Sequence, residues 1–559
     1  MPTKTNMFSL HPIKFLALFA LLSLPACGDS ADETIVENAA QIGFGMIREA
    51  DLRTHLEWLA DDAREGRGAG EAGYDASAKY VSDFFEELGL FPAGDEGWYQ
   101  QVPLVSYKID TESTSVIVHR DGEDRELTYR EHYGMNGDKV RAENSVRAEV
   151  VYVGFGVHAP EFGYSDYDGV DVEGKIVAYF RGAPSTFEHY ARAYYASGRA
   201  KAHEAVRRGA IGSVGLRSRR SQESMSWERY KQRTGKRSGM SWVNLSGEAS
   251  SYFPELRGGV TISAATAEEL FQGTPLSFED ALNKMEADEI ASVPLGFEIS
   301  LSRRSTHENL TSPNVIGMVR GTDPGLADEY VLYSAHLDAV GIDPAPETDD
   351  NINNGAYDNA IGVSIMLETA RYFAANPPAR SVLFIALTAE EKGLLGSDYF
   401  AHYPTVPTDS IIANVNLDMP LFLYPVADMV AFGSEHSSLE PVVAKAAESH
   451  GFELTPNPMP EENLFVRSDQ YSFVRRGIPA IYLIPGLNSS DPDIDGEAML
   501  REHLKDYYHK PGDDLARPVD WDSVVRFTRA HIQMGESVAN DPVRPTWNEG
   551  DFFGERFAN

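Results

Sequence analysis

Residues 330–341 read YVLYSAHLDAVG, residues 381–397 read SVLFIALTAEEKGLLGS, and residues 411–419 read IIANVNLDM. Each stretch begins with an apolar run of strand length and continues into polar residues. Uninterrupted apolar runs of this length are typical of parallel strands that are buried on both faces. His336, Glu390 and Asp418 therefore lie at or just past the carboxyl ends of predicted strands, and we expect an α/β fold with a mostly parallel sheet.

A fourth polar residue precedes an apolar helix. In NNGAYDNAIGV, residues 353–363, Asp358 lies between a glycine-containing loop and the helical run, which indicates a helix-entry turn. Open α/β sheets bind ligands in the crevice at their strand carboxyl ends. Carboxylates crowded there stay ionised only if positive charge offsets them, and imidazole with carboxylate suits zinc. The sequence thus predicts a metal site; the alternative is a set of ordinary loop and capping acids.

The ordered set H-x-D, D-N, E-E-x-G-L-L-G-S, N-x-D-M and a late Y-H resembles the zinc aminopeptidase family M28, whose members are dizinc exopeptidases. The resemblance extends from about residue 50 to about residue 540. It implies that Asp358 bridges two zinc ions. His336 and Asp418 would complete one ion, and Glu391 and His509 would complete the other. Two metals at such a site can activate one water and polarise the scissile carbonyl.

The resemblance implies roles for two further carboxylates. Asp338 would accept the second ring N–H of His336 and fix its tautomer. Glu390 would be the general base, which takes a proton from the attacking water and later delivers it to the leaving amine. The family also has a non-proline cis peptide after its bridging aspartate, which implies one between Asp358 and Asn359.

The last predicted ligand lies late in the chain. His509 in DYYHKPGDD, residues 506–514, fits the family's final ligand, because the neighbouring tyrosine, proline and acids also match. His503 is the competing candidate. The stretch FVRSDQYSF, residues 465–473, resembles the family's Ser-Asp-His segment, with Gln470 in place of the usual histidine. This departure concerns local substrate contacts, because that residue is not one of the five ligands.

Length and charge limit the classes of protein. With 559 residues, the chain is too long for one compact core, and we expect two or three domains. The formal net charge of -36 argues against nucleic-acid binding and against a polybasic membrane patch. Cys27 is the only cysteine, so the rest of the chain has no thiol for disulfides, thiolate catalysis or cysteine-type zinc sites.

The amino terminus predicts export. Residues 1–27 carry Lys4 and Lys14 ahead of an apolar run, residues 15–24, that is too short to span a bilayer, as in a secretory signal peptide. LPAC at residues 24–27 resembles a bacterial lipobox, in which Cys27 is lipidated and becomes the new amino terminus. Pro25 departs from the usual small residue, so simple secretion is the alternative. We expect a periplasmic or outer-membrane or cell-surface lipoprotein.

The middle of the chain differs in its predicted elements, which are short β-like runs with one helix. Four stretches resemble a protease-associated (PA) domain inserted into the peptidase: EVVYVGFGV, YDGVDVEGKIVAYFRG, AHEAVRRGAIGSVGL and VTISAATAEELF. In the family, this domain covers the active-site cleft or selects substrates. Residues 217–237, which are locally basic, are predicted as a solvated loop, with a substrate contact as the alternative. The predicted organisation is signal 1–27, tether 28–41, amino-terminal peptidase part 42–133, β-rich PA domain 134–295, catalytic domain 296–541 and tail 542–559.

The sequence thus predicts a secreted or lipid-anchored dizinc aminopeptidase that acts on peptides through metal-activated water. A carboxypeptidase of the same superfamily is one alternative, with Arg467, Arg475 and Arg476 near the cleft segments to bind a carboxylate. A single-zinc glutaminyl cyclase is another. The last alternative is a catalytically dead binding module, which is disfavoured because all five ligands are present. The oligomeric state and the preferred side chain do not follow from the sequence.

Overall fold

The computed structural model describes residues 43–343 and 349–558. Contacts divide the chain into residues 1–46 and residues 47–559, and every element named below belongs to the second unit. The predicted signal segment, the predicted tether and Cys27 lie outside the described residues. Within the described ranges, no helix has both the length and the apolar character that a membrane crossing requires.

Seven strands form the part of the sheet that carries the predicted site, in the order β19-β18-β20-β17-β13-β16-β12. The strand β13 pairs in parallel with β16 and with β17, and β17 pairs in parallel with β20. The predicted mixed, mostly parallel sheet is confirmed. Its strands are β12 (Val293–Val319), β13 (Tyr330–His336), β16 (Ser381–Leu387), β17 (Ile411–Asn416), β18 (Asp428–Phe432), β19 (Glu453–Leu454) and β20 (Ala480–Pro485).

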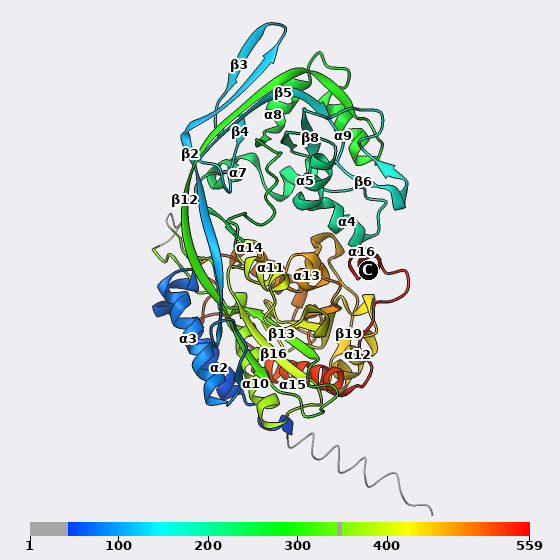
Figure 1. Cartoon of the computed structure of the whole chain (residues 1–559). Helices are drawn as coiled ribbons and strands as arrows, with labels where there is room; N and C mark the ends of the chain where they lie inside the picture. Colours follow the sequence, from blue (N-terminus) through cyan, green and yellow to red (C-terminus); the bar gives the residue numbers. More distant parts are fainter. Residues whose placement is uncertain (1–42, 344–348, 559) are drawn as a thin grey trace, which may run out of the picture. The chain divides into compact units, whose positions relative to one another are not determined.

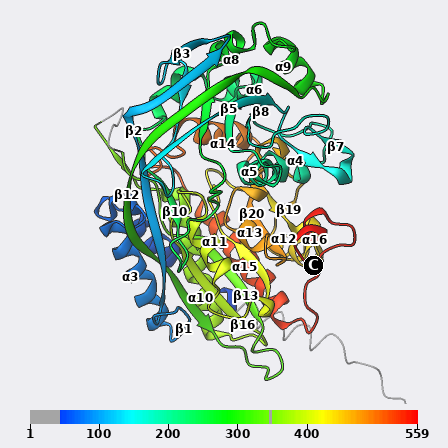
Figure 2. The ribbon, with the colours of Figure 1, turned by 45° about the horizontal axis from the view of Figure 1, so that its top comes forward.

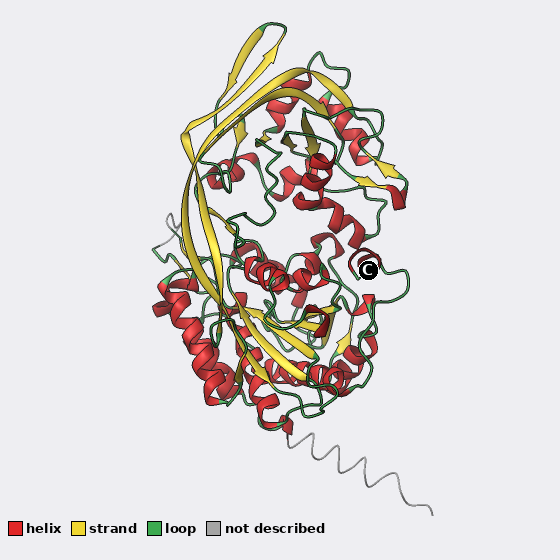
Figure 3. Ribbon diagram, viewed as in Figure 1, coloured by secondary structure: helices red, strands yellow, loops and turns green. Residues whose placement is uncertain are grey.

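Burial explains why the three apolar runs form the centre of this sheet. Every residue of β16 and β17 is buried, and so is every residue of β13 after Tyr330. Helices cover these strands (Figure 3). The helices of this region are α2 (Glu49–Leu59), α3 (Ala72–Glu87), α10 (Ile361–Ala375), α11 (Leu395–His402), α12 (Glu440–Ser449), α13 (Gln470–Val474), α14 (Gly496–Asp506), α15 (Trp521–Asn540) and α16 (Phe552–Phe557).

Two long strands join this region to the inserted segment. The strand β2 (Tyr99–Arg120) pairs antiparallel with β12, from Tyr99 opposite Val315 to His119 opposite Glu298. Figure 1 shows β2 in blue and β12 in green as two long curved strands that run side by side. The short strand β10 (Gly239–Trp242) pairs with β2 and so returns from the inserted segment toward the first sheet region. The strand β12 therefore runs through the predicted domain boundary at residues 295 and 296.

The inserted segment has its own parallel strands and apolar cluster. The strands β5 (Glu143–Tyr152), β8 (Ile176–Phe180), β9 (Gly212–Leu216) and β11 (Gly259–Ile262) pair in parallel in that order. A buried apolar cluster extends from Ile109 to Leu301. The main helices are α4 (His189–Ala196), α5 (Gly198–Arg207), α8 (Ala264–Phe271) and α9 (Phe278–Glu286). The assignment as a PA domain stays a prediction.

The prediction of a loop at residues 217–237 is wrong. The segment that was predicted as a solvated loop holds two short helices, α6 (Arg219–Ser224) and α7 (Trp227–Arg233). Serine side chains cap both helices: Ser218 accepts the backbone N–H of Ser221, and Ser226 accepts that of Arg229. These caps satisfy amide groups that a short helix leaves open.

Candidate metal centre

The strand ends bring the predicted residues to one edge of the sheet. His336 is the last residue of β13, Glu390 follows β16, and Asp418 follows β17. Asp358 lies in the turn of residues 356–360, which leads directly into α10. His509 follows α14. Because β13, β16 and β17 are parallel, their carboxyl ends meet at the same edge, as the sequence predicted.

The first donor group consists of His336, Asp358 and Asp418. The ring Nε2 of His336 lies 3.2 Å from Asp358 Oδ1 and 3.2 Å from Asp418 Oδ1. One ligand atom from each of the three residues lies within 4.8 Å of the other two, and all three residues are buried. This is the set that the resemblance assigns to one zinc ion.

The second donor group consists of Asp358, Glu391 and His509. The ring Nε2 of His509 lies 3.2 Å from Asp358 Oδ2 and 3.0 Å from Glu391 Oε2. Asp358 therefore belongs to both groups and presents a different oxygen to each. The His509 side chain is 38% exposed whereas that of His336 is 0% exposed, so the second group lies on the solvent side.

Buried charge dominates the electrostatics of both groups. Burial lowers the pKa of His336, but Asp418, Glu390 and Asp358 together raise it well above its usual value. Burial likewise lowers the pKa of His509, and its bonds to Asp358 and Glu391 raise it to about 10. Without a metal, the protonated rings of His336 and His509 thus balance the negative charge of the carboxylates. A metal cation would balance the same charge.

The donor chemistry fits zinc. Imidazole nitrogen and carboxylate oxygen are the donors that zinc accepts from histidine, aspartate and glutamate. Glu391 Oε1 is buried and has no hydrogen-bond partner within the described structure, so this carboxylate has unused capacity. Burial raises the pKa of the neighbouring Glu390 carboxyl well above its usual value, with Asp418 among the contributors. The two glutamates therefore differ in environment although they are adjacent.

Asp338 acts through different atoms from those predicted. The ring Nδ1 of His336 donates to the backbone carbonyl oxygen of Asp338 at 3.1 Å and lies 3.9 Å from the carboxylate. The carboxylate instead accepts the backbone N–H groups of Glu390 at 3.0 Å and Glu391 at 3.3 Å. The His336 tautomer is thus fixed by a main-chain oxygen, while the Asp338 side chain holds the turn that carries both glutamates.

The peptide bond that follows Asp358 is cis, as the resemblance implies. The side chain of Asn359 connects this turn to the end of β17. It donates to the carbonyl oxygen of Leu417 at 2.8 Å and accepts the backbone N–H of Met419 at 3.1 Å. The turn of Asp358 and the segment that carries Asp418 are therefore bonded to each other.

Two buried residues that support the site are not among the predicted site residues. Arg67 is 1% exposed and donates to four backbone carbonyl oxygens, including those of Leu337 at 2.8 Å and Gly355 at 2.9 Å. Asp513 accepts the backbone N–H groups of Tyr357 and Asp358, both at 3.0 Å. The stretch YHKPGDD gives a signal for Asp513, whereas the glycine-rich turn around Arg67 gives none.

The structure distinguishes the two late histidines. His509 lies in the second donor group, whereas His503 is fully buried and stacks on Tyr507 at 5.9 Å between ring centroids. Burial lowers the pKa of His503 to about 4. Gln470 also lies outside both groups; its side chain accepts from Asn416 at 2.9 Å. The preference for His509 is consistent with this geometry.

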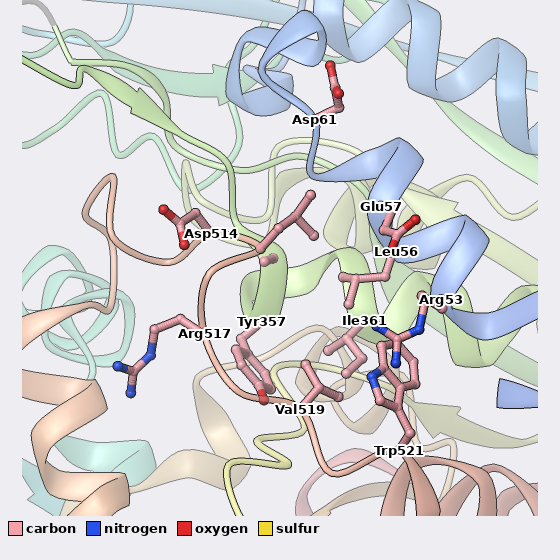
Figure 4. A pocket seen from close by; sticks show the side chains of 12 residues that line it. Arg53, Leu56, Glu57, Asp61, Tyr357, Ile361, Asp514, Arg517, Val519 and Trp521 are labelled. Atoms are coloured by element: carbon pink, nitrogen blue, oxygen red, sulfur yellow. The ribbon is translucent and has the colours of Figure 1, made fainter. Parts of the chain in front are cut away.

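One cavity of the structure lies away from the donor groups. It has a volume of about 520 Å³, and Figure 4 shows Arg53, Leu56, Tyr357 and Trp521 among its lining side chains. None of the five predicted ligands lines it. Its wall includes Tyr357, the residue before Asp358, so it lies behind the turn rather than in front of the donor atoms.

A smaller cavity opens beside the second donor group. It has a volume of about 240 Å³ and is lined by Glu391 and His509 together with Lys392, Arg237 and Met240. The last two residues come from the segment around β10, so the inserted part of the chain contributes to the surroundings of the candidate metal centre. A second cavity, of only about 10 Å³, is lined by Asp358, Glu391 and His509.

Comparisons with known proteins find peptidases that are similar to this chain. Residues 314–534 match the family described as Peptidase family M28. Aminopeptidase YwaD of Bacillus subtilis (strain 168) is 30% identical over 214 residues, which cover 37% of this chain and 40% of that protein. Aminopeptidase Y of Saccharomyces cerevisiae is 25% identical, covering 46% of this chain and 45% of that protein. The matches thus span less than half of either relative.

A solved structure shows the same fold over more of the chain. The aminopeptidase from Aneurinibacillus sp. strain AM-1 aligns with a TM-score of 0.50 at 18% sequence identity. The alignment covers 90% of this chain and 96% of that chain. The two chains therefore share a fold.

Proposed function

We propose that this protein is a dizinc aminopeptidase of the M28 type that removes amino-terminal residues from peptides. The observation that carries the proposal is Asp358, whose two carboxylate oxygens face two separate donor groups. Support also comes from the match of residues 314–534 and from the names of the relatives, which are aminopeptidases.

The proposed zinc ligands are the members of the two donor groups. His336 and Asp418 would hold one ion, Glu391 and His509 would hold the other, and Asp358 would be shared. When bound, the two ions would activate a water molecule and polarise the scissile carbonyl. The backbone oxygen of Asp338 keeps the proton of the His336 ring on Nδ1, which leaves Nε2 with its lone pair toward the donor group.

Glu390 is the proposed general base. Its carboxylate accepts a proton from the attacking water and delivers that proton to the leaving amine. Burial raises its pKa well above the usual range, which suits a group that must both accept and release a proton near neutral pH. Asp338 positions Glu390 through the backbone N–H group at 3.0 Å, so the base is held by a buried carboxylate rather than by a mobile loop alone.

A carboxypeptidase is the second candidate, and the cation that favours it is Lys392, which is not one of the three predicted arginines. Arg475 is engaged with Asp398 at 2.7 Å, and Arg467 lies 3.5 Å from Glu462. Lys392 and Arg237 line the cavity beside Glu391 and His509, but Arg237 lies 3.6 Å from Asp343. Lys392 would attract a substrate carboxylate at this position.

We also propose that the protein is exported and anchored by lipid at Cys27. The lipobox-like LPAC stretch supports this location, with secretion without an anchor as the alternative. Metabolic labelling with a fatty acid, compared between the natural chain and Cys27→Ala, would separate the two. Label in the natural chain that Cys27→Ala loses is the result expected for the anchor.

A panel of end-blocked peptides tests the activity. We expect hydrolysis of peptides with a free amino terminus, including those with an amidated carboxyl terminus, and no hydrolysis of acetylated peptides. Cleavage of acetylated but not amidated peptides would instead establish the carboxypeptidase. Each reaction is repeated with a chelator, which should abolish hydrolysis, and then with added zinc, which should restore it. Hydrolysis that a chelator leaves unchanged would refute both candidates.

A further inference from the structure

A cavity in the inserted segment has an unusual charge for this chain. It has a volume of about 320 Å³ and is lined by Arg181, Arg217 and Arg220. No acidic side chain of the described residues lines it. The whole chain, by contrast, has 85 acidic and 49 basic residues. Three arginines without an acid therefore form a local positive field in an acidic protein.

The parallel strands place two of these arginines together. Arg181 directly follows β8, and Arg217 directly follows β9, which is the parallel neighbour of β8. Carboxyl ends of neighbouring parallel strands are where open sheets bind ligands. Arg220 lies in α6, which follows β9 and is labelled in Figure 2, and it lines the same cavity as Arg181 and Arg217. The cavity thus has the position of a ligand site as well as the charge of one.

The three guanidinium groups have donors that the protein does not use. The guanidinium groups of Arg181 and Arg220 form no ion pair or hydrogen bond with any described residue. Arg217 is 7% exposed and donates through Nη2 to the backbone oxygens of Ser221 and Met225, but its buried Nε has no partner in the described structure. A buried donor without a partner is costly unless a ligand supplies the acceptor.

Arg219, the neighbour of Arg220, differs because its guanidinium group has partners within the protein. Its guanidinium bonds to Glu279 at 2.6 Å, to Asn283 at 3.0 Å and to Glu286. Acids of α9 therefore satisfy the arginine that points away from the cavity, while the arginines that line the cavity have no carboxylate partner. The difference indicates that the cavity is kept free for an external anion.

We propose that this cavity binds the oxyanion group of a small amphipathic ligand, either a phosphate or a carboxylate. Guanidinium groups match both oxyanions through paired N–H bonds. The hydroxyl of Ser218 accepts the N–H of Ser221 and retains its own hydrogen to donate. Leu216, Met225 and the ring of Tyr230 supply an apolar wall for the rest of the ligand. The volume lies at the lower end of small-molecule sites.

Calorimetric titration of the full-length, zinc-loaded protein tests the proposal. The probes are inorganic phosphate, N-acetylleucine as the carboxylate, and N-acetylleucinamide as the uncharged control; the acetyl group removes the free amine that an aminopeptidase would bind. The test variant is Arg181→Gln with Arg220→Gln, because both side chains are exposed and outside the core. The matched control is Arg219→Gln. Thermal unfolding confirms that both variants are folded.

We expect phosphate, N-acetylleucine or both to bind, and N-acetylleucinamide not to bind. The double variant should weaken oxyanion binding by about tenfold or more, since charged hydrogen bonds are lost, and Arg219→Gln should change it by less than about twofold. Which probe binds identifies phosphate or carboxylate as the source of the oxyanion. The proposal is overturned if neither oxyanion binds, or if binding persists in the double variant, as it would for an ion held at the metal centre.

Discussion

The carboxylate of Asp358 is bonded on both sides. One oxygen lies 3.2 Å from the His336 ring and the other lies 3.2 Å from the His509 ring. The backbone N–H of Asp358 is held by Asp513 at 3.0 Å. A side chain fixed at its main chain and shared by two donor groups is preorganised for two ions, since little reorganisation is needed when they bind.

Replacement of Glu390 by glutamine tests the general base. Glutamine has nearly the same shape but cannot accept the proton, so turnover should fall by about 100- to 10,000-fold. The zinc content should stay unchanged, because this residue belongs to neither donor group. Steady-state hydrolysis of a free amino-terminal peptide, together with zinc analysis, checks both statements. Near-normal turnover in a zinc-replete variant would refute the assignment.

For single residues, the sequence predicts which ones form the site but not all of their contacts. His336, Asp358 and Asp418 could be predicted because each follows a short-range pattern, an apolar run or a helix start. The partner of the His336 ring could not be predicted. Asp338 offers both a main-chain oxygen and a carboxylate, and the backbone geometry decides which of the two the ring reaches. Arg67 could not be predicted either, since three of its four carbonyl partners, in Leu337, Asn354 and Gly355, are remote in sequence.

Among the elements, α11 connects the inserted segment to the site region through Asp398. This residue is 5% exposed and accepts from Trp242 Nε1 at 2.9 Å, from the Ser250 hydroxyl at 2.9 Å and from Arg475 at 2.7 Å. Trp242 is the last residue of β10, the strand that contains the cavity residue Met240 and begins two residues after Arg237. One buried carboxylate thus fixes the wall of that cavity.

Replacement of Asp398 by alanine should therefore destabilise the protein. Removal of one partner from a buried charge pair costs about 3–5 kcal/mol, because Arg475 is left without its carboxylate. The matched control is Asp83→Ala on α3, where the partner Lys79 is exposed and the cost should stay within about 0.5 kcal/mol. Denaturant unfolding of both variants makes the comparison. Equal stability of the two variants would show that the buried network around α11 contributes nothing.

The strands differ in how far local sequence predicts them. The runs of β13, β16 and β17 are continuously apolar, because both faces are buried, so their bounds follow from composition. The long strand β12 mixes buried and exposed positions and shifts register between Ser302 and Arg304. Its length depends on pairing with β2 and β5, which are remote in sequence, so no local pattern indicates it.

For the whole molecule, metal binding should be coupled to stability. The donor groups gather acids at a buried site in a chain whose formal net charge is already -36. Zinc that binds only the folded state stabilises it by about 2.7 kcal/mol when free zinc exceeds the dissociation constant about 100-fold. A chelator should lower the midpoint of thermal unfolding, and added zinc should restore it.

The control for this coupling is Asp358→Ala, which removes the shared ligand. Its unfolding midpoint should not respond to the chelator, because it would not retain the ions. A chelator effect of the same size in the natural chain and in Asp358→Ala would show that the stabilising metal binds elsewhere.

The zinc content per chain tests the shared-ligand centre most directly. Elemental analysis of the purified, dialysed protein should give two zinc ions in the natural chain, one in His336→Ala, one in His509→Ala and none in Asp358→Ala. His503→Gln, which changes a buried histidine outside the donor groups, should retain both. A natural chain with a single zinc ion, or an Asp358→Ala variant that keeps two, would contradict the account.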